Sequence, residues 1–212
     1  MISVQAFECG PVATMVYLVC NPALGEAFCI DAPPDSSALV LAAAETAGCR
    51  ITHLLLTHTH WDHTADAAEL VRQTGAQVYV HAHDAYRLID PMRHTIWPLP
   101  FTIEPVIPNR YVEHGERFTV AGVELEVIHT PGHTEGGVCF VDHAHRRVFV
   151  GDTLFYGSVG RTDLPGGDMQ ILTTSIKERL FTLPETYSAY PGHGPVTTIG
   201  EERRANPFVG IT

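Results

Sequence analysis

Three histidines and one aspartate fall within the six positions from His58 to His63, in the order His-Thr-His-Trp-Asp-His. Imidazole and carboxylate groups are ligands that zinc, iron and manganese accept in proteins. The cluster directly follows the apolar run 51–56, which predicts a strand buried on both faces. If the backbone is still extended at first, His58 and His60 point the same way. Asp62 and His63 would then follow a bend, so one motif could supply two neighbouring ions.

Three more side chains share one design: a possible metal ligand follows an apolar strand and has glycine beside it. Glycine allows the sharp turns and the close backbone approach that a crowded ion site needs. In layered α/β folds, sites assemble at the carboxyl ends of the strands. The three residues are His133 after residues 127–128, Asp152 after residues 148–150, and His193 after residues 187–190.

The elements that must position these side chains alternate between strands and helices, which is typical of a layered α/β fold. Residues 35–37 can cap a helix that Gly48 closes, and Thr64 can cap one that ends at Gly75. A helical stripe of apolar residues spans 168–183, with Asp168 as its N-cap. Strands are predicted over 2–7, 15–20, 27–30, 51–56, 77–80, 117–120, 123–129, 137–141, 147–150 and 186–190.

The composition fits one globular domain over residues 1–212. Hydrophobic residues make up 45% of the chain and charged residues 17%. Five prolines between residues 91 and 108 predict a long irregular excursion, of the kind that forms lids or substrate walls. The two halves of the chain have similar patterns of elements, but no sequence repeat indicates a duplication.

Charge and apolar patterning exclude several classes of partner. The net charge of −11 and the lack of a basic stripe count against nucleic acid. The apolar runs are far shorter than the roughly 20 residues needed to span a bilayer, so no membrane partner is expected. The N-terminus does not resemble a signal peptide, which predicts a cytoplasmic protein. The five cysteines form no Cys-x-x-Cys pair and are expected to be buried apolar residues in a reducing compartment.

The ordered set of His-x-His-x-Asp-His, His133, Asp152 and His193 resembles the metallo-β-lactamase superfamily. This resemblance covers nearly the whole chain, and it implies an αβ/βα four-layer sandwich of two mixed β-sheets flanked by helices. Aspartate rather than cysteine at position 152, together with His63, is similar to the glyoxalase II branch and unlike true metallo-β-lactamases. Two further stretches, residues 157–168 and 191–202, resemble the small single-domain type II glyoxalases of bacteria.

The resemblance implies a centre of two divalent metal ions. Nitrogen and oxygen ligands without a thiolate suit zinc, which is the expected metal, and also iron or manganese. Asp62 and Asp152 are the expected catalytic carboxylates. The family pattern places His58, His60 and His133 on the first ion, Asp62, His63 and His193 on the second, and Asp152 between them.

Two neighbouring cations can supply hydroxide at neutral pH, so no separate nucleophile is required. A thiolate leaves without protonation more readily than an alkoxide, because thiol pKa values are near 8 to 9. A thioester is therefore an easy substrate, and the resemblance points to hydrolysis of S-lactoylglutathione or a related hydroxyacyl thioester by a metal-bridging hydroxide. Arg161 stands where larger glyoxalase II enzymes place a basic residue for the glycine carboxylate of glutathione. An arginine paired with Asp163 or Asp168 is an equal alternative.

The chain departs from the larger glyoxalase II enzymes in two ways. It stops about twenty residues after His193, so no C-terminal helical glutathione-binding domain is expected. Asp163 stands where those enzymes use an aromatic residue. Both departures concern the glutathione site and not the predicted hydrolysis.

Three alternatives stay open at this point. A mononuclear Fe(II) persulfide dioxygenase of the same superfamily would use a face of two histidines and one carboxylate, which His58, His133 and Asp152 could form. A lactonase would use the same ions, with Tyr156 as a hydrogen-bond donor to the substrate. A metal-binding module without enzymatic activity is the third class, and it would not need two incomplete coordination shells.

The remaining histidines lack the strand-end context of the predicted ligands. The pair His81 and His83 mimics a ligand pair after a strand, but a core or surface role is the stronger interpretation. Trp61 is expected to pack and to shape the ligand loop. The other histidines are His53, His94, His114, His129, His143 and His145.

Overall fold

The computed structural model describes residues 1–211, which divide into two compact units. The first unit comprises residues 1–111 and 119–123, and the second comprises residues 112–118 and the chain from residue 124 onward. A six-stranded sheet accompanies each half of the chain. The expectation of a single domain over residues 1–212 stays a prediction.

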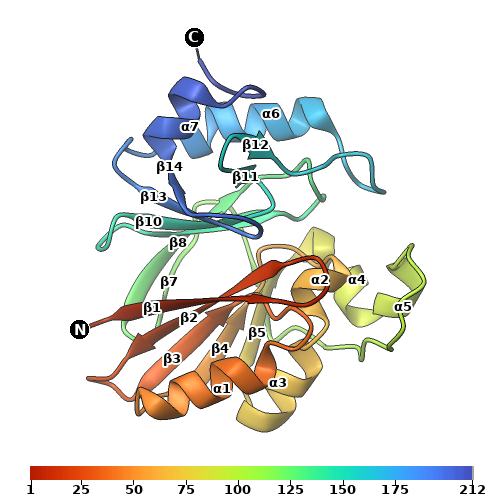
Figure 1. Ribbon diagram of the computed structural model, residues 1–212, viewed down its shortest axis with the longest axis vertical. Helices are drawn as coiled ribbons and strands as arrows, with labels where there is room; N and C mark the ends of the chain where they lie inside the picture. Colours follow the sequence, from red (N-terminus) through yellow and green to blue (C-terminus); the bar gives the residue numbers. More distant parts are fainter. Residues whose placement is uncertain (212) are drawn as a thin grey trace. The chain divides into compact units, whose positions relative to one another are not determined.

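The first sheet has the strand order β1-β2-β3-β4-β5-β6 and contains both antiparallel and parallel pairs (Figure 1). β1, β2 and β3 form the predicted antiparallel meander, whereas β3, β4 and β5 run parallel. Since the carboxyl ends of parallel strands meet at one edge, the loops after β3, β4 and β5 are neighbours. The strands are β1 (Ser3–Cys9), β2 (Thr14–Asn21), β3 (Glu26–Ile30), β4 (Arg50–Leu55), β5 (Gln77–His81) and β6 (Arg110–Val112).

Two helices pack against this sheet, α1 (Ser37–Thr46) and α3 (Ala67–Thr74). Their apolar residues, such as Val40 and Leu70, join Leu18 and Leu54 from the strands in one buried cluster. Burial of such side chains contributes about 1.5–3 kcal/mol each. This core fixes β4 and therefore the start of the ligand loop that follows it.

The second sheet has the order β14-β13-β10-β9-β8-β7 (Figure 1). β8, β9 and β10 are antiparallel neighbours, and β10 pairs in parallel with β13. Leu172 and Ile176 of the helix α6 (Met169–Glu178) pack with Val148 and Val150 of β10. The strands are β7 (Arg117–Val120), β8 (Val123–His129), β9 (Val138–Asp142), β10 (Arg147–Gly151), β13 (Ser188–Pro191) and β14 (Thr197–Thr198), with a separate hairpin of β11 (Leu154–Phe155) and β12 (Ser158–Val159).

Two of the predicted helix boundaries are wrong. Thr64 does not cap α3, because it ends the short helix α2 (Trp61–Thr64) and the N-cap of α3 is Asp66. The helix predicted over 168–183 ends at Glu178, where a 3-10 turn over Leu180–Thr182 takes over. Its predicted cap is confirmed, because the Asp168 carboxylate accepts hydrogen bonds from two backbone N–H groups of the first turn.

The structure also contains helices that the sequence did not predict. The proline-rich excursion is not wholly irregular, since α5 (Pro91–His94) begins with proline at its first turn, where the missing N–H costs no hydrogen bond. It follows α4 (Ala85–Ile89) and the 3-10 turn η1 (Ala82–Asp84). Near the end of the chain, α7 (Ile199–Ala205) is capped by Thr198, whose side chain accepts from the N–H of Glu201.

The described part of the chain contains no helix that could cross a membrane. None of the helices there combines the length and the apolar character of a bilayer span.

Candidate metal centre

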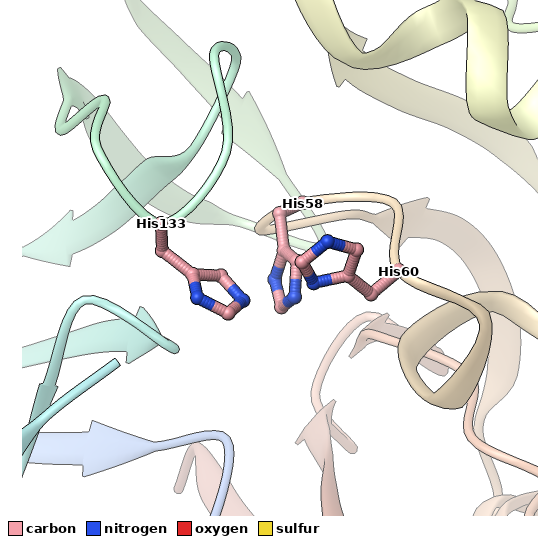
Figure 2. A group of neighbouring side chains, drawn as sticks. All are labelled: His58, His60 and His133. Carbon is pink, nitrogen blue, oxygen red and sulfur yellow. The ribbon is translucent and has the colours of Figure 1, made fainter. Parts of the chain in front are cut away.

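The first unit brings together the four predicted ligands of the His58 to His63 cluster. His60 is still extended, with φ −64° and ψ 152°, and α2 begins at the next residue. The predicted bend inside the motif is therefore confirmed as the start of a helix. The ring centroid of His58 lies 5.0 Å from that of His60 and 4.1 Å from that of His63. Figure 2 shows the imidazoles of His58 and His60 side by side on this loop, and also draws His133.

Asp31, at the carboxyl end of β3, is a buried carboxylate that holds this cluster. One of its oxygens accepts from the N–H of Thr57 at 2.8 Å. The other accepts from the Thr57 hydroxyl at 2.7 Å and pairs with Nδ1 of His63 at 2.8 Å. Asp31 is 2% exposed and adopts a φ of 61°. The left-handed conformation is one that aspartate tolerates better than most residues, and here it aims the carboxylate at the ligand loop.

These hydrogen bonds determine which ring nitrogens can bind a metal. A carboxylate only accepts, so Nδ1 of His63 carries the proton and Nε2 has the lone pair. The Thr57 hydroxyl donates to Asp31, and it can therefore accept from Nδ1 of His58 at 3.2 Å. His58 thereby has the same tautomer. Metal-binding histidines commonly have their other ring nitrogen engaged in this way.

Asp62 is oriented by a second strand of the same unit. The Thr14 hydroxyl donates to its Oδ2 at 3.0 Å. The same oxygen lies 3.6 Å from Nε2 of His63. Both atoms can therefore serve one ion, as the sequence predicts for this pair.

The second unit brings together the other three predicted ligands. His133 follows β8, Asp152 follows β10 and His193 follows β13. Oδ2 of Asp152 lies 3.5 Å from Nε2 of His133 and 3.5 Å from Nε2 of His193. One carboxylate oxygen thus stands equally far from two histidines that the family pattern assigns to different ions.

His133 is also oriented through its second ring nitrogen. Its Nδ1 lies 2.7 Å from the backbone carbonyl oxygen of Arg161. Since a carbonyl only accepts, Nδ1 carries the proton and Nε2 faces Asp152 with its lone pair. The approach requires glycine at the preceding position. A Cβ atom on Gly160 would lie 1.9 Å from the carbonyl oxygen of Asp152 and 3.1 Å from Nδ1 of His133.

The two predicted substrate-binding residues, Arg161 and Tyr156, are more exposed than the predicted ligands. The Arg161 guanidinium donates from Nε and Nη2 to the two carboxylate oxygens of Asp163, both at 2.8 Å. This bidentate pair raises the pKa of Arg161 and lowers that of Asp163 to about 2. Of the two carboxylates considered as structural partners of Arg161, it is Asp163 and not Asp168 that forms the pair. Tyr156 lies between β11 and β12 and is 57% exposed.

Several residues outside the predicted ligand set have hydrogen-bonding or packing roles. Nδ1 of His81 accepts from the backbone N–H of His83 at 3.3 Å and so caps the η1 turn. Trp61 packs near Phe101 of the excursion, with ring centroids 6.1 Å apart, in keeping with its predicted packing role. All five cysteines are buried, as expected.

Sequence reasoning missed the residues that orient the predicted ligands, chiefly Asp31 and Thr57. Asp31 carries the signal used for the other ligands, since it directly follows the apolar strand 27–30.

The sequence of the chain is similar to a known protein family and to characterised proteins. A family model described as the metallo-beta-lactamase superfamily matches residues 9–193. The hydroxyacylglutathione hydrolase GloC of Haemophilus influenzae is 38% identical over 159 residues, which cover 74% of this chain and 74% of GloC.

Solved structures are similar over almost the whole chain. BLEG-1, a B3 metallo-beta-lactamase, has a TM-score of 0.90 and 32% identity, covering 98% of this chain and 99% of BLEG-1. TTHA1623 in a di-iron-bound form has a TM-score of 0.85 and 38% identity, with coverage of 97% and 100%. ETHE1 from Myxococcus xanthus has a TM-score of 0.83 and 29% identity, with coverage of 98% and 84%. The predicted fold of mixed sheets flanked by helices is confirmed.

Proposed function

Because the chain belongs to the metallo-β-lactamase superfamily, we propose that it is a metal-dependent thioester hydrolase of the glyoxalase II type. The substrate would be S-lactoylglutathione or a related hydroxyacyl thioester, a small molecule. The family fold implies divalent metal ions, and the described residues include histidine-rich groups that could hold them. A cytoplasmic location, and no partnership with nucleic acid, stay predictions.

One observation carries the proposal: the position of Asp152 between two histidines. Its Oδ2 is 3.5 Å from Nε2 of both His133 and His193. A carboxylate in this position suits a bridging ligand of two ions. We propose that all seven predicted ligands hold such a pair, namely His58, His60, Asp62, His63, His133, Asp152 and His193.

The donor set fits divalent ions of intermediate hardness. It consists of imidazoles and carboxylates, and the five cysteines are buried apart from it as free thiols. Such a set suits zinc, iron or manganese, and similarity to a di-iron protein keeps iron as a serious candidate beside zinc. When bound, the ions would supply a hydroxide at neutral pH and polarise the thioester carbonyl.

The side chains of the protein have definite tasks in such a reaction. The tautomers of His58, His63 and His133 are set by Thr57, Asp31 and the carbonyl of Arg161, so Nε2 is the ligand atom in each. Asp62 and Asp152 are the proposed catalytic carboxylates. The leaving thiolate needs no general acid, because thiols are acidic enough to leave as anions.

The test is hydrolysis of S-lactoylglutathione by the purified chain, followed through thiol release, with the metal content of the same preparation measured. We expect activity that a chelator abolishes and that zinc, iron or manganese restores. The variant His193→Ala should lose at least ~100-fold in kcat/KM, whereas His143→Ala, a histidine outside the ligand set, should retain the activity. A metal-loaded protein that hydrolyses an acyl lactone or a β-lactam faster than any glutathione thioester would refute the proposal.

A second candidate is a persulfide dioxygenase with one Fe(II), and the similarity to ETHE1 favours it over the lactonase. Its face of two histidines and a carboxylate would be His58, His133 and Asp152. This enzyme would contain one iron per chain and consume oxygen with glutathione persulfide. The hydrolase would consume none.

A further inference from the structure

A buried aspartate outside the predicted ligand set holds the loop between two ligands. Asp84 ends the η1 turn after β5 and is 0% exposed. Its Oδ2 accepts from the backbone N–H of Thr59 at 3.1 Å. Its backbone carbonyl accepts from the Thr59 hydroxyl at 2.7 Å. The backbone N–H and the hydroxyl of Thr59 are therefore both held by one residue.

Asp84 is in turn fixed by a buried cation. Nη1 of Arg87 donates to Oδ1 of Asp84 at 3.2 Å, and Arg87 is only 5% exposed. The guanidinium carbon also lies 4.5 Å from the centre of the Tyr86 ring. The two oxygens of the carboxylate thus have separate tasks, one toward Arg87 and one toward Thr59. A buried pair of this kind can contribute little net stability, but it restricts a loop to one conformation.

Thr59 lies between His58 and His60, so its backbone orientation sets the direction of both imidazoles. We propose that Asp84 is a positioning residue: by holding Thr59 it fixes His58 and His60 in the orientation that binds a divalent ion. The proposal rests on the proposed function, since it assumes that these histidines are ligands. Their ring planes stand at 90° to each other with centroids 5.0 Å apart.

The test compares two double variants that both lack the ion pair. Asp84→Asn with Arg87→Met keeps an oxygen that can accept from Thr59, whereas Asp84→Ala with Arg87→Met removes it. The readouts are the zinc dissociation constant, from competition with a chromophoric chelator, and the visible spectrum of the cobalt-substituted protein. We expect the alanine variant to bind zinc about 10–100-fold more weakly with an altered cobalt spectrum. The asparagine variant should bind within about threefold of the wild type.

A matched control separates positioning from general stability. Asp142 and Arg147 form another buried ion pair, with Nε of Arg147 donating to Oδ2 of Asp142 at 2.8 Å. The variant Asp142→Ala with Arg147→Met should lower the melting temperature without changing zinc affinity. Equal zinc affinities of the two Asp84 variants, or an equal loss in this control, would overturn the proposal.

If the alanine variant does not fold, the variants Thr59→Val and Thr59→Ser test the positioning role instead. Serine keeps the hydroxyl bonded to the Asp84 carbonyl and valine removes it. The valine variant should bind zinc about fivefold more weakly than the serine variant, the value of one neutral hydrogen bond. Equal affinity of the two Thr59 variants would refute the positioning role.

Failure of the inference and failure of the proposed function have different signatures. A wild-type protein that binds zinc but does not hydrolyse thioesters would refute the function and leave the affinity comparison valid. Wild-type hydrolysis with unchanged affinities in the variants would refute the positioning role alone. A wild-type protein that binds no divalent ion would refute both.

Discussion

Replacing Asp31 with asparagine tests whether hydrogen bonds select the metal-binding tautomer of His63. Asparagine has the same shape and also tolerates the φ of 61° found here, so the backbone is not disturbed. Its oxygen can still accept from the N–H of Thr57. Its NH₂ group, however, replaces the acceptor that lies 2.8 Å from Nδ1 of His63. Two donors would then face each other unless His63 moves its proton to Nε2.

The size of the effect follows from the bond that is lost. A hydrogen bond to a charged group contributes about 1.5–3 kcal/mol, so Asp31→Asn should lower the free energy of unfolding of the metal-free protein by about that much. The proton on Nε2 of His63 must in addition be displaced before an ion can bind there. Loss of such a partner typically weakens metal binding about 10–100-fold. The affinity for the second ion should fall within this range.

The assay is a chelator competition titration that resolves the two ions, with thermal unfolding of the metal-free protein measured in parallel. Asp66→Asn is the matched control. Asp66 accepts from the N–H of Ser37 at 2.9 Å in the same unit, and it is not among the predicted ligands. The control keeps an oxygen that can accept from the N–H of Ser37, and it should keep its metal affinity. If Asp31→Asn binds both ions as tightly as Asp66→Asn does, the tautomer argument is wrong.

Further predictions concern the second unit and the ions. Gly160→Ala should fold but lose metal affinity at least ~10-fold in the same titration, because its Cβ would lie 1.9 Å from the carbonyl oxygen of Asp152. Asp163→Asn should release Arg161 and lower KM for glutathione thioesters about two- to fivefold without changing kcat, and a raised KM would contradict this. Because the pKa of Asp163 is lowered from 3.8 to about 2, the Arg161 pair is complete above pH 3.8 and is lost only as the pH falls through about 2. KM should therefore show no titration of this pair between about pH 5 and 9. Chelator treatment should lower the melting temperature, and zinc at 100 times its dissociation constant should restore about 2.7 kcal/mol per site in thermal unfolding.

The strand-end positions of the predicted ligand residues could be expected from the sequence because two independent patterns coincide there. Histidine and aspartate directly after a buried apolar run are costly without a partner, and glycine beside them signals a turn. The structure places His133, Asp152 and His193 at the ends of β8, β10 and β13, as these patterns predict. Local signals sufficed because strand burial and the following ligand are both encoded within a few residues.

Helix boundaries were less predictable because tertiary contacts decide between competing caps. Thr64 has the right residue type for an N-cap, but its hydroxyl instead donates to the carbonyl of His60 within α2. Asp66 takes the N-cap position of α3, and its carboxylate accepts from the N–H of Ser37, 29 residues away. Such a long-range partner leaves no trace in the local sequence.

The orienting carboxylates of the first unit show why a ligand motif alone does not describe a metal centre. β4 is the middle strand of the parallel set β3, β4 and β5, so its ligand loop has a strand end on each side. Asp31 reaches the loop from the end of β3 and binds Thr57 and His63, whereas Asp84 reaches it from beyond β5 and binds Thr59. Each carboxylate holds a different part of the loop. A parallel sheet can therefore fix a flexible, ligand-rich loop from two sides, and an isolated His-x-His-x-Asp-His segment without those neighbours would lack the constraint that selects its tautomers.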